Sequence, residues 1–423
     1  MVLKSCCVYS VGVVSVLMLI LGISLVLTSV FPHLVQSMVK KQVVLKNDTD
    51  AFEAWKDPPA HIYMQFYFFN LTNPQEVLDG ERPAVVEIGP YTYREYRPME
   101  QIDFQDNGTK VTAVNTKTYI FQRNMSRGPE SDLVRTVNIP AMTVMERFKD
   151  NFVEANLISA YMKGTGQGLF TTRTVGELLW GYEDGLLKAL KIIRPDLDDV
   201  FGLFYKNNAS NDGEYVFFTG QQNYRDFSRV DMWKGESSLN WWTSDECNMI
   251  NGTIGTAFHP VITKNDMLYI FSSDLCRHRA PIIMSSPHFY QADEKFAQDV
   301  FGMTPNKEEH QTTIDINPLT GVVLQTAKRL QINVYVEQIP TFSQTGNVRT
   351  VVFPVAYLNE SATIDDTAAK KLKAIGVQQN VVENIPFMLI GLAIIVGGIF
   401  MFLVCQQRVP ESTAAERQPL LSS

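Results

Sequence analysis

Hydrophobic residues gather at the two ends of the chain. Val8–Phe31 and Ile385–Cys405 contain 24 and 21 residues without a charge. About 20 apolar residues in a helix cross the roughly 30 Å hydrocarbon core of a bilayer. A cleavable signal peptide has a shorter apolar region, about 7–15 residues, before a small-residue cleavage site. The pattern therefore predicts two transmembrane helices at residues 8–31 and 385–405, the first of them an uncleaved anchor.

Residues 32–384 mix strand and helix patterns. Aromatic and β-branched runs predict strands at residues 61–70, 84–88, 91–96, 213–220, 267–272, 331–338 and 348–358, and a hairpin at 110–123. Two amphipathic patterns, Met142–Met162 and Thr174–Ile193, predict helices, and a further short helix is expected at 365–376. No βαβ alternation is present, which indicates an α+β protein with a mostly antiparallel β body and a helical bundle at 141–193.

The glycosylation sequons predict the topology. Chance would place about three Asn-X-Ser/Thr motifs between the spans. Seven are found there, at Asn47, Asn70, Asn107, Asn124, Asn208, Asn251 and Asn359. Such a concentration favours a glycosylated lumenal or extracellular domain at 32–384. Both short tails, residues 1–7 and 406–423, are then expected in the cytosol.

Charge and length limit the possible partners and the domain organisation. The 423 residues carry a net charge of −8, without a basic stripe interleaved with aromatic residues. Nucleic acid is therefore not expected as a partner. The 353 residues between the spans exceed the roughly 250–300 at which a single core stops growing. We expect one large domain with sub-lobes, or two lobes.

No motif predicts catalysis. The chain has no Gly-X-Ser-X-Gly elbow, His-Glu-X-X-His pair or P-loop. His259, His288 and His310 are candidates, and the acidic residues after His288 would suit a metal or acid–base site, but structural histidines are commoner. Carboxylates such as Glu87 and Glu95 are expected in ion pairs or on solvated faces. We therefore predict no enzyme activity, catalytic residue, cofactor or metal.

The cysteines fall into two groups. Cys6, Cys7 and Cys405 lie at the expected cytosolic ends of the spans. Such cysteines are candidates for S-palmitoylation, the alternative being small apolar residues at a helix end. Cys247 and Cys276 belong to the large domain and could pair in an oxidising compartment. Sequence alone leaves that pairing open.

The C-terminal tail contains a sorting pattern. Glu416 stands four positions before the pair Leu420 and Leu421. An extended peptide of this kind can place both leucines in an apolar adaptor pocket and the carboxylate against a basic patch. The pattern predicts an acidic-dileucine signal for endosomes and lysosomes, read by clathrin-adaptor complexes.

Several stretches together resemble the class B scavenger receptor family, and most closely its lysosomal member. They are NLTNPQEVLDGERPAVVEIGPYTYRE (residues 70–95), CNMINGT (247–253), APIIMSSPHFYQADEKF (280–296), DINPLTG (315–321) and AKRLQINVYV (327–336). The two terminal spans and the ERQPLL tail fit as well, so the resemblance covers nearly the whole chain.

The resemblance implies both a fold and a function. It implies an antiparallel β-barrel body with an apical helical bundle, and a tunnel for lipids such as cholesterol and phospholipid. It also implies a lysosomal and late endosomal receptor that carries β-glucocerebrosidase by means of the bundle. The partner-binding residues would then be those of the first bundle helix: Met145, Phe148, Asn151, Phe152, Ala155 and Ile158.

Two departures from the family pattern are expected to matter. The family has a substantial cysteine-containing segment after the position of Cys276, whereas here Cys276 is followed almost directly by Ala280. The chain is thus identified as an internally deleted form, for which exposed strand edges predict weaker folding and poor exit from the endoplasmic reticulum. The lysosomal member also has a histidine near the position of Asn151, and asparagine cannot titrate.

The sequence is also compatible with other functions. A cell-surface lipid or lipoprotein scavenger receptor of the same family is one, although the dileucine tail argues against it. A poorly folding splice form with reduced function is another. An ecto-hydrolase would need a convergent acid–base pair that the sequence does not reveal.

Overall fold

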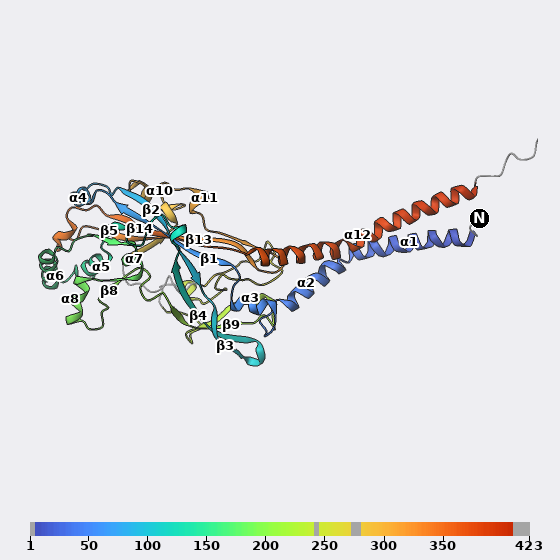
Figure 1. The fold of residues 1–423 in the computed structure, drawn as a ribbon, viewed down its shortest axis with the longest axis horizontal. Helices are drawn as coiled ribbons and strands as arrows, with labels where there is room; N and C mark the ends of the chain where they lie inside the picture. The colour runs from blue at the N-terminus through green and yellow to red at the C-terminus, as the bar shows by residue number, and fades with distance from the viewer. Residues whose placement is uncertain (1–4, 241–244, 272–280, 409–423) are drawn as a thin grey trace, which may run out of the picture. The chain divides into compact units, whose positions relative to one another are not determined.

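The structure, a computed structural model, describes residues 5–240, 245–271 and 281–408 (Figure 1). The chain divides into two compact units. One unit contains residues 1–40 and 369–423, and the other contains residues 41–368.

The first unit is built from long helices. Helices α1 (Ser5–Leu27) and α12 (Asp366–Arg408) each contain a stretch long and apolar enough to cross a membrane. Helix α1 stops four residues before the predicted end, and Ser29, with φ of 50°, separates it from α2 (Val30–Gln42). The short helix predicted at 365–376 continues without a break into the apolar stretch, so both are part of α12.

Glycine and serine allow α1 and α12 to approach closely. The Ser15 hydroxyl donates a hydrogen bond to the Ala393 carbonyl oxygen at 2.9 Å. A Cβ atom on Gly12 would lie 3.0 Å from the Phe400 ring. Such short-range packing is what holds helices together where lipid removes the hydrophobic driving force.

The second unit is organised around one ten-stranded antiparallel sheet. The order along the sheet is β10-β9-β4-β2-β1-β14-β13-β11, with β12 on β13 and β3 on β4. The strands are β1 (His61–Leu71), β2 (Val85–Tyr96), β3 (Met99–Gln105), β4 (Lys110–Phe121), β9 (Ser210–Phe218), β10 (Val230–Trp233), β11 (Ile282–Ser285), β12 (Thr313–Ile316), β13 (Val323–Val336) and β14 (Val351–Thr363).

Every predicted strand except 267–272 overlaps an observed strand, although the ends differ. The predicted strands at 84–88 and 91–96 are both part of β2, which runs through a cis Gly89–Pro90 bond. The predicted hairpin at 110–123 is the single strand β4, and the hairpin is formed by β3 and β4. At 267–272, the residues that the structure describes contribute only an isolated bridge at Ile270.

The expectation of a barrel needs correction, because the sheet is open. Its two end strands, β10 and β11, have four residues each and do not pair with each other in the described part of the chain. Between them, the described residues form isolated bridges and one short helix, α9 (Asp245–Asn248). No further described strand is therefore available to close the sheet.

The bundle consists of four helices, each with an N-terminal cap. They are α5 (Ile139–Phe148), α6 (Phe152–Thr165), α7 (Val175–Trp180) and α8 (Gly185–Ile193). Their capping side chains are Asn138, Asn151, Thr174 and Asp184. The sequence predicted only two helices here, because the apolar residues keep a helical spacing through both segments. In the structure, the N-caps Asn151 and Asp184 divide each segment into two helices.

Two apolar clusters form the interior of the second unit. The larger joins the sheet, including Phe66, Phe68 and Phe353, to the bundle. The smaller packs α3 (Asp50–Lys56) against β3, β4, β9 and β10. Short elements complete the unit: α4 (Pro74–Leu78), α10 (Glu294–Gln298), α11 (Lys307–His310) and the strand pairs β5 (Leu133–Val137) with β6 (Phe170–Thr174) and β7 (Tyr182–Glu183) with β8 (Val200–Phe201).

Candidate functional site

Helix α6 presents an apolar face to solvent. Phe152, Val153 and Leu157 are 72%, 67% and 68% exposed. At about 100° per residue, the three side chains fall within an arc of about 140° around the helix axis, so they share one broad side of α6. The opposite face is buried, with Ala155 and Met162 fully covered. Large apolar side chains clustered on one exposed helix face are typical of a protein-binding surface.

Helix α6 is fixed in place by polar contacts at its buried side. The Ser159 hydroxyl donates to the Gln344 side-chain oxygen at 2.9 Å, and the Gln344 amide donates to the Ser159 carbonyl at 2.8 Å. At its C-terminus, the Tyr161 hydroxyl donates to the carbonyl oxygen of Gly185, the first residue of α8. These contacts attach α6 to Gln344 outside the bundle and to the start of α8.

The six predicted partner-binding residues are spread over different environments. Met145 and Ala155 are fully buried, and Phe148 and Ile158 pack against the same core. The Asn151 side chain caps α6 by accepting a hydrogen bond from the Glu154 amide at 3.3 Å. Only Phe152 belongs to the exposed face. The sequence analysis did not select the other two residues of the exposed face, Val153 and Leu157. Both are apolar residues outside the regularly spaced apolar positions of the helix, and this departure from the spacing could have identified them.

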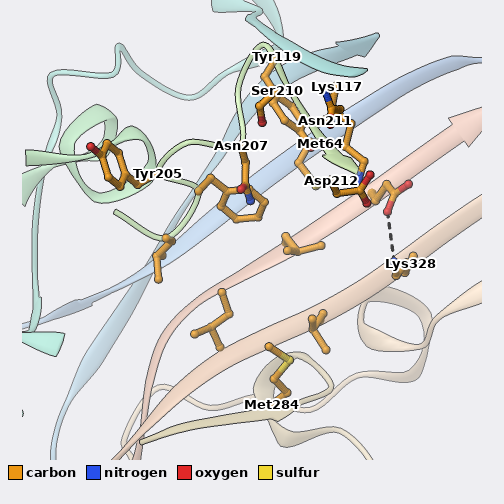
Figure 2. A pocket seen from close by; sticks show the side chains of 16 residues that line it. Met64, Lys117, Tyr119, Tyr205, Asn207, Ser210, Asn211, Asp212, Met284 and Lys328 are labelled. Atoms are coloured by element: carbon orange, nitrogen blue, oxygen red, sulfur yellow. Dashed lines mark ion pairs between the residues drawn. The ribbon is translucent and has the colours of Figure 1, made fainter. Parts of the chain in front are cut away.

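A second candidate site is a cavity of about 130 Å³ beside strands β1, β13 and β14 (Figure 2). Its walls are mostly apolar side chains from the strands and from the loop before β9: Met64, Leu203, Phe204, Met284, Leu330, Ile332 and Leu358. Lys117, Asp212 and Lys328 add charges to the lining. An apolar floor with charged groups beside it suits an amphipathic molecule.

A cluster of ion pairs adjoins this cavity, and two of its members, Glu360 and Lys328, line it. Arg97 Nη1 lies 2.8 Å from Glu360 Oε1 and 3.6 Å from Glu95 Oε1. Lys328 Nζ lies 3.6 Å from the other Glu360 oxygen (Figure 2). Burial alone would raise the pKa of Glu360, but the charges of Arg97, Lys328 and Lys117 outweigh it and lower that pKa. Glu95 therefore stands in an ion pair, as expected from the sequence.

The histidines singled out from the sequence occupy structural positions. His288 and His310 are both 3% exposed and lie side by side, and His288 bonds to Glu87. His259 packs on the Tyr224 ring. Of the acidic residues after His288, Asp293 caps α10. Within the described ranges, no three His, Cys, Asp or Glu side chains are placed to hold a metal ion.

The sequon asparagines all lie in the second unit. Asn47, Asn107, Asn124 and Asn208 are exposed. Three are half-buried and hydrogen-bonded: Asn70 accepts from the Arg135 amide, Asn251 accepts from the Gly252 amide, and Asn359 donates to Gln65. Glycosylation at these positions stays a prediction.

Several predicted sites fall outside the described residues. These are the tail with Glu416, Leu420 and Leu421, all of Cys276, and the side chains of Cys6, Cys7 and Cys247. Cys405 is described, and it has an exposed free thiol near the end of α12. The palmitoylation, sorting and disulfide predictions therefore stay predictions.

Known proteins match most of the chain. The model of the CD36 family matches residues 13–279 and 276–404. Lysosome membrane protein 2 of Rattus norvegicus is 46% identical over 474 positions, which cover 98% of this chain and 99% of the relative. The Homo sapiens protein of that name is 44% identical with the same coverage. Scavenger receptor class B member 1 of Cricetulus griseus is 32% identical, covering 93% of this chain and 87% of the relative.

The comparisons also locate the internal deletion. The 474 aligned positions exceed the 423 residues of this chain by 51, so at least that many positions have no counterpart here. The two family matches meet at residues 276–279. The interruption therefore lies where the sequence predicted it, just after Cys276 and immediately before β11, the short end strand of the open sheet.

Proposed function

The chain belongs to the CD36 family, and on that premise we propose that it is a non-enzymatic, double-pass receptor of lysosomal and late endosomal membranes that binds and transports β-glucocerebrosidase. The observation that carries the proposal is the exposed apolar face of α6, formed by Phe152, Val153 and Leu157. Truncation of a few clustered large side chains typically removes most of the binding energy of an interface.

The lysosomal location is supported by two observations of different kinds. Relatives that share 44–46% of their residues with this chain are named lysosome membrane protein 2. The tail residues Glu416, Leu420 and Leu421 form the spacing of an acidic-dileucine signal, which clathrin-adaptor complexes would bind. Both tails then lie in the cytosol, and the glycosylated domain lies in the lumen.

We further propose that the second unit binds lipid, such as cholesterol or phospholipid, at its inner cavity. Apolar side chains of β1, β13 and β14 supply the walls, and Lys117 and Lys328 supply positive charge for a headgroup. At about 130 Å³ the cavity is smaller than the roughly 300–1,000 Å³ of typical ligand pockets. A lipid would therefore place only part of its length there unless the loop before β9 moves.

Enzyme delivery in cells tests the receptor function. Cells that lack their own receptor would express this chain or a triple variant, Phe152→Ser with Val153→Ser and Leu157→Ser. The wild-type chain should restore β-glucocerebrosidase activity in lysosomes, and the variant should not. Ile120→Thr, a substitution of a 50% exposed residue on β4, is the matched control and should behave as wild type. Equal delivery by the triple variant would refute the assignment of the α6 face.

A cell-surface lipid scavenger receptor is the second candidate. It is favoured by the 32% identity to scavenger receptor class B member 1 and by the apolar cavity. Replacing Leu420 and Leu421 with alanine separates the two functions. A lysosomal receptor sorted by this signal should move to the cell surface, whereas a surface receptor should keep its location.

A further inference from the structure

Two imidazole rings form a buried pair outside the cavity and the bundle. The ring centroids of His288 and His310 are 4.5 Å apart, with their planes inclined by 13°. His288 lies in a single helical turn, Pro287–Phe289, and His310 ends α11. The Tyr357 ring lies steeply inclined to both imidazoles, and the Phe69 ring packs against His288. The pair is thus enclosed between the sheet and the segment that contains α10 and α11.

The hydrogen bonds determine which nitrogen of each ring carries the proton. The Thr304 amide donates to His288 Nδ1 at 3.0 Å, and the Asn306 amide donates to His310 Nδ1 at 2.9 Å. A backbone N–H can only donate, so each Nδ1 must be an unprotonated acceptor. Each neutral ring then has its hydrogen on Nε2, and that of His288 is donated to Glu87 Oε2 at 2.6 Å.

This arrangement links protonation to detachment of a loop. The only lone pair left to accept a proton on either ring is Nδ1, where a backbone amide already donates. Protonation would place two N–H groups against each other, so the hydrogen bond must break. At His288 the broken bond joins two separate segments, and at His310 it joins α11 to its own N-cap, Asn306. Thr304 and Asn306 are both exposed, so water can accept the released amides without a buried unsatisfied donor.

Other charged and titratable groups face the pair from each surrounding element. Glu87 on β2 favours a charged imidazole, and Arg329 on β13 opposes it. Tyr67 and Tyr357 on β1 and β14 stack on each other, and Glu309 on α11 lies near both. Burial, the neighbouring His288 and Arg329 together lower the pKa of His310 to about 4, against the opposing charge of Glu87.

The anchored loop is also connected to the end of the sheet. The His288 amide donates to the Gln331 side chain at 2.7 Å, Gln331 donates to Asn333, and Asn333 donates to the Ile283 carbonyl on β11. A single hydrogen-bonded chain therefore runs from Glu87 on β2 through His288 to β11. Movement of His288 would loosen this short end strand as well.

We propose that His288 and His310 form an acid-operated latch: the neutral rings hold the loop Thr304–Asn306, which leads into α11, in its folded conformation, and protonation of either ring releases that loop. The device responds to acidification of the surrounding compartment. It is independent of α6, because none of its residues belongs to the bundle.

Hydrogen exchange on the full chain in lipid nanodiscs tests the latch. Exchange would be measured from pH 7 to pH 4, corrected for intrinsic rates, in peptides covering residues 300–312 and, as an internal reference, 351–363. One proton taken up on opening changes the opening equilibrium by about tenfold per pH unit. Protection at 300–312 should therefore fall by up to about tenfold per unit below pH 6.5, while protection of β14 stays constant.

Matched variants separate the latch from general acid sensitivity. In His288→Asn and His310→Asn, the asparagine oxygen takes the position of Nδ1 and can accept the same amide hydrogen but cannot titrate. The double variant should keep protection at pH 7 and lose its pH dependence, whereas His259→Asn should behave as wild type. Constant protection of 300–312 in the wild-type chain, or an unchanged pH dependence in the double variant, would overturn the proposal.

Discussion

Arg97 and Glu360 form a salt bridge of 2.8 Å, with side chains that are 13% and 14% exposed, and Glu360 also lines the cavity. Burial opposes ionisation of both groups, yet their mutual attraction dominates, so the pKa of Glu360 is lowered and that of Arg97 is raised. Glu95 and Lys328 complete the cluster. Removing one partner would leave the other charge buried without compensation.

Glu360→Gln should therefore destabilise the folded domain by about 3–5 kcal/mol at pH 7, measured by denaturant unfolding. Because the folded-state pKa of Glu360 is lowered, its contribution is complete above its unfolded value of 4.5 and is lost only as pH falls through the lower folded value. The cost should be the same at pH 5. Glu183→Gln breaks an exposed pair with Lys188 and should cost less than about 1 kcal/mol. Equal stabilities of the two variants would contradict this assignment.

His310 also loses stability on acidification, but in a higher pH range than Glu360. Its pKa falls from 6.5 in the unfolded chain to about 4 in the fold, so the unfolded state binds more protons between these values. Stability should decrease as pH falls from 6.5 to 4, by up to about 3 kcal/mol. His310→Asn should flatten this part of the pH–stability curve. A variant with the wild-type slope would show that another group is responsible.

Buried and exposed bundle residues should differ in stability effects. Met145→Ala removes a fully buried side chain and should cost about 2–5 kcal/mol. Phe152→Ala removes a side chain that is 72% exposed and should change stability by no more than about 0.5 kcal/mol. Thermal unfolding of the two variants checks this difference. A large loss for Phe152→Ala would mean that the exposed face supports the fold.

Asn151 offers a test of pH-dependent binding. As the N-cap of α6 it does not titrate, so binding through α6 should change little with pH at this position. Asn151→His would place a positive charge at the helix N-terminus in acid, which the helix dipole disfavours. Enzyme binding by this variant should weaken between pH 7 and pH 5 more than binding by Asn151→Ser. Parallel pH curves for both variants would exclude a role for charge at this position.

The internal deletion predicts slow maturation of the protein. Residues that would follow Cys276 in the relatives are missing, and β11 remains a four-residue end strand. Insertion of the missing segment should increase the fraction of chains whose glycans become resistant to endoglycosidase. If both forms mature equally, the open sheet is sufficient for export.

Many strands and helices could be predicted because the spacing of apolar residues within each segment indicates its secondary structure. The aromatic run at His61–Leu71 and the stripe from Met142 to Met162 identified β1 and the bundle. The break at Asn151 was missed because the apolar spacing continues across it, although asparagine is a common N-cap.

Long-range contacts were not predictable in the same way. Glu87 and His288 are 201 residues apart, and only the pairing of β2, β1, β14 and β13 brings them together. The closed barrel was expected from the family, but closure depends on strands that the shortened chain does not supply in its described part. The predicted partner-binding residues of α6 lie mostly on its buried face, because regularly spaced apolar residues in a helix face the core.

Direct binding of purified β-glucocerebrosidase to the full chain in nanodiscs tests the central claim most directly. A titration would compare wild type, the Phe152→Ser, Val153→Ser and Leu157→Ser triple variant, and the Ile120→Thr control at neutral pH. We predict saturable binding by wild type and control, and at least about 30-fold weaker binding by the triple variant, corresponding to 2 kcal/mol or more for a lost hot-spot cluster. Equal affinity of the triple variant, or no binding by the wild-type chain, would contradict the account.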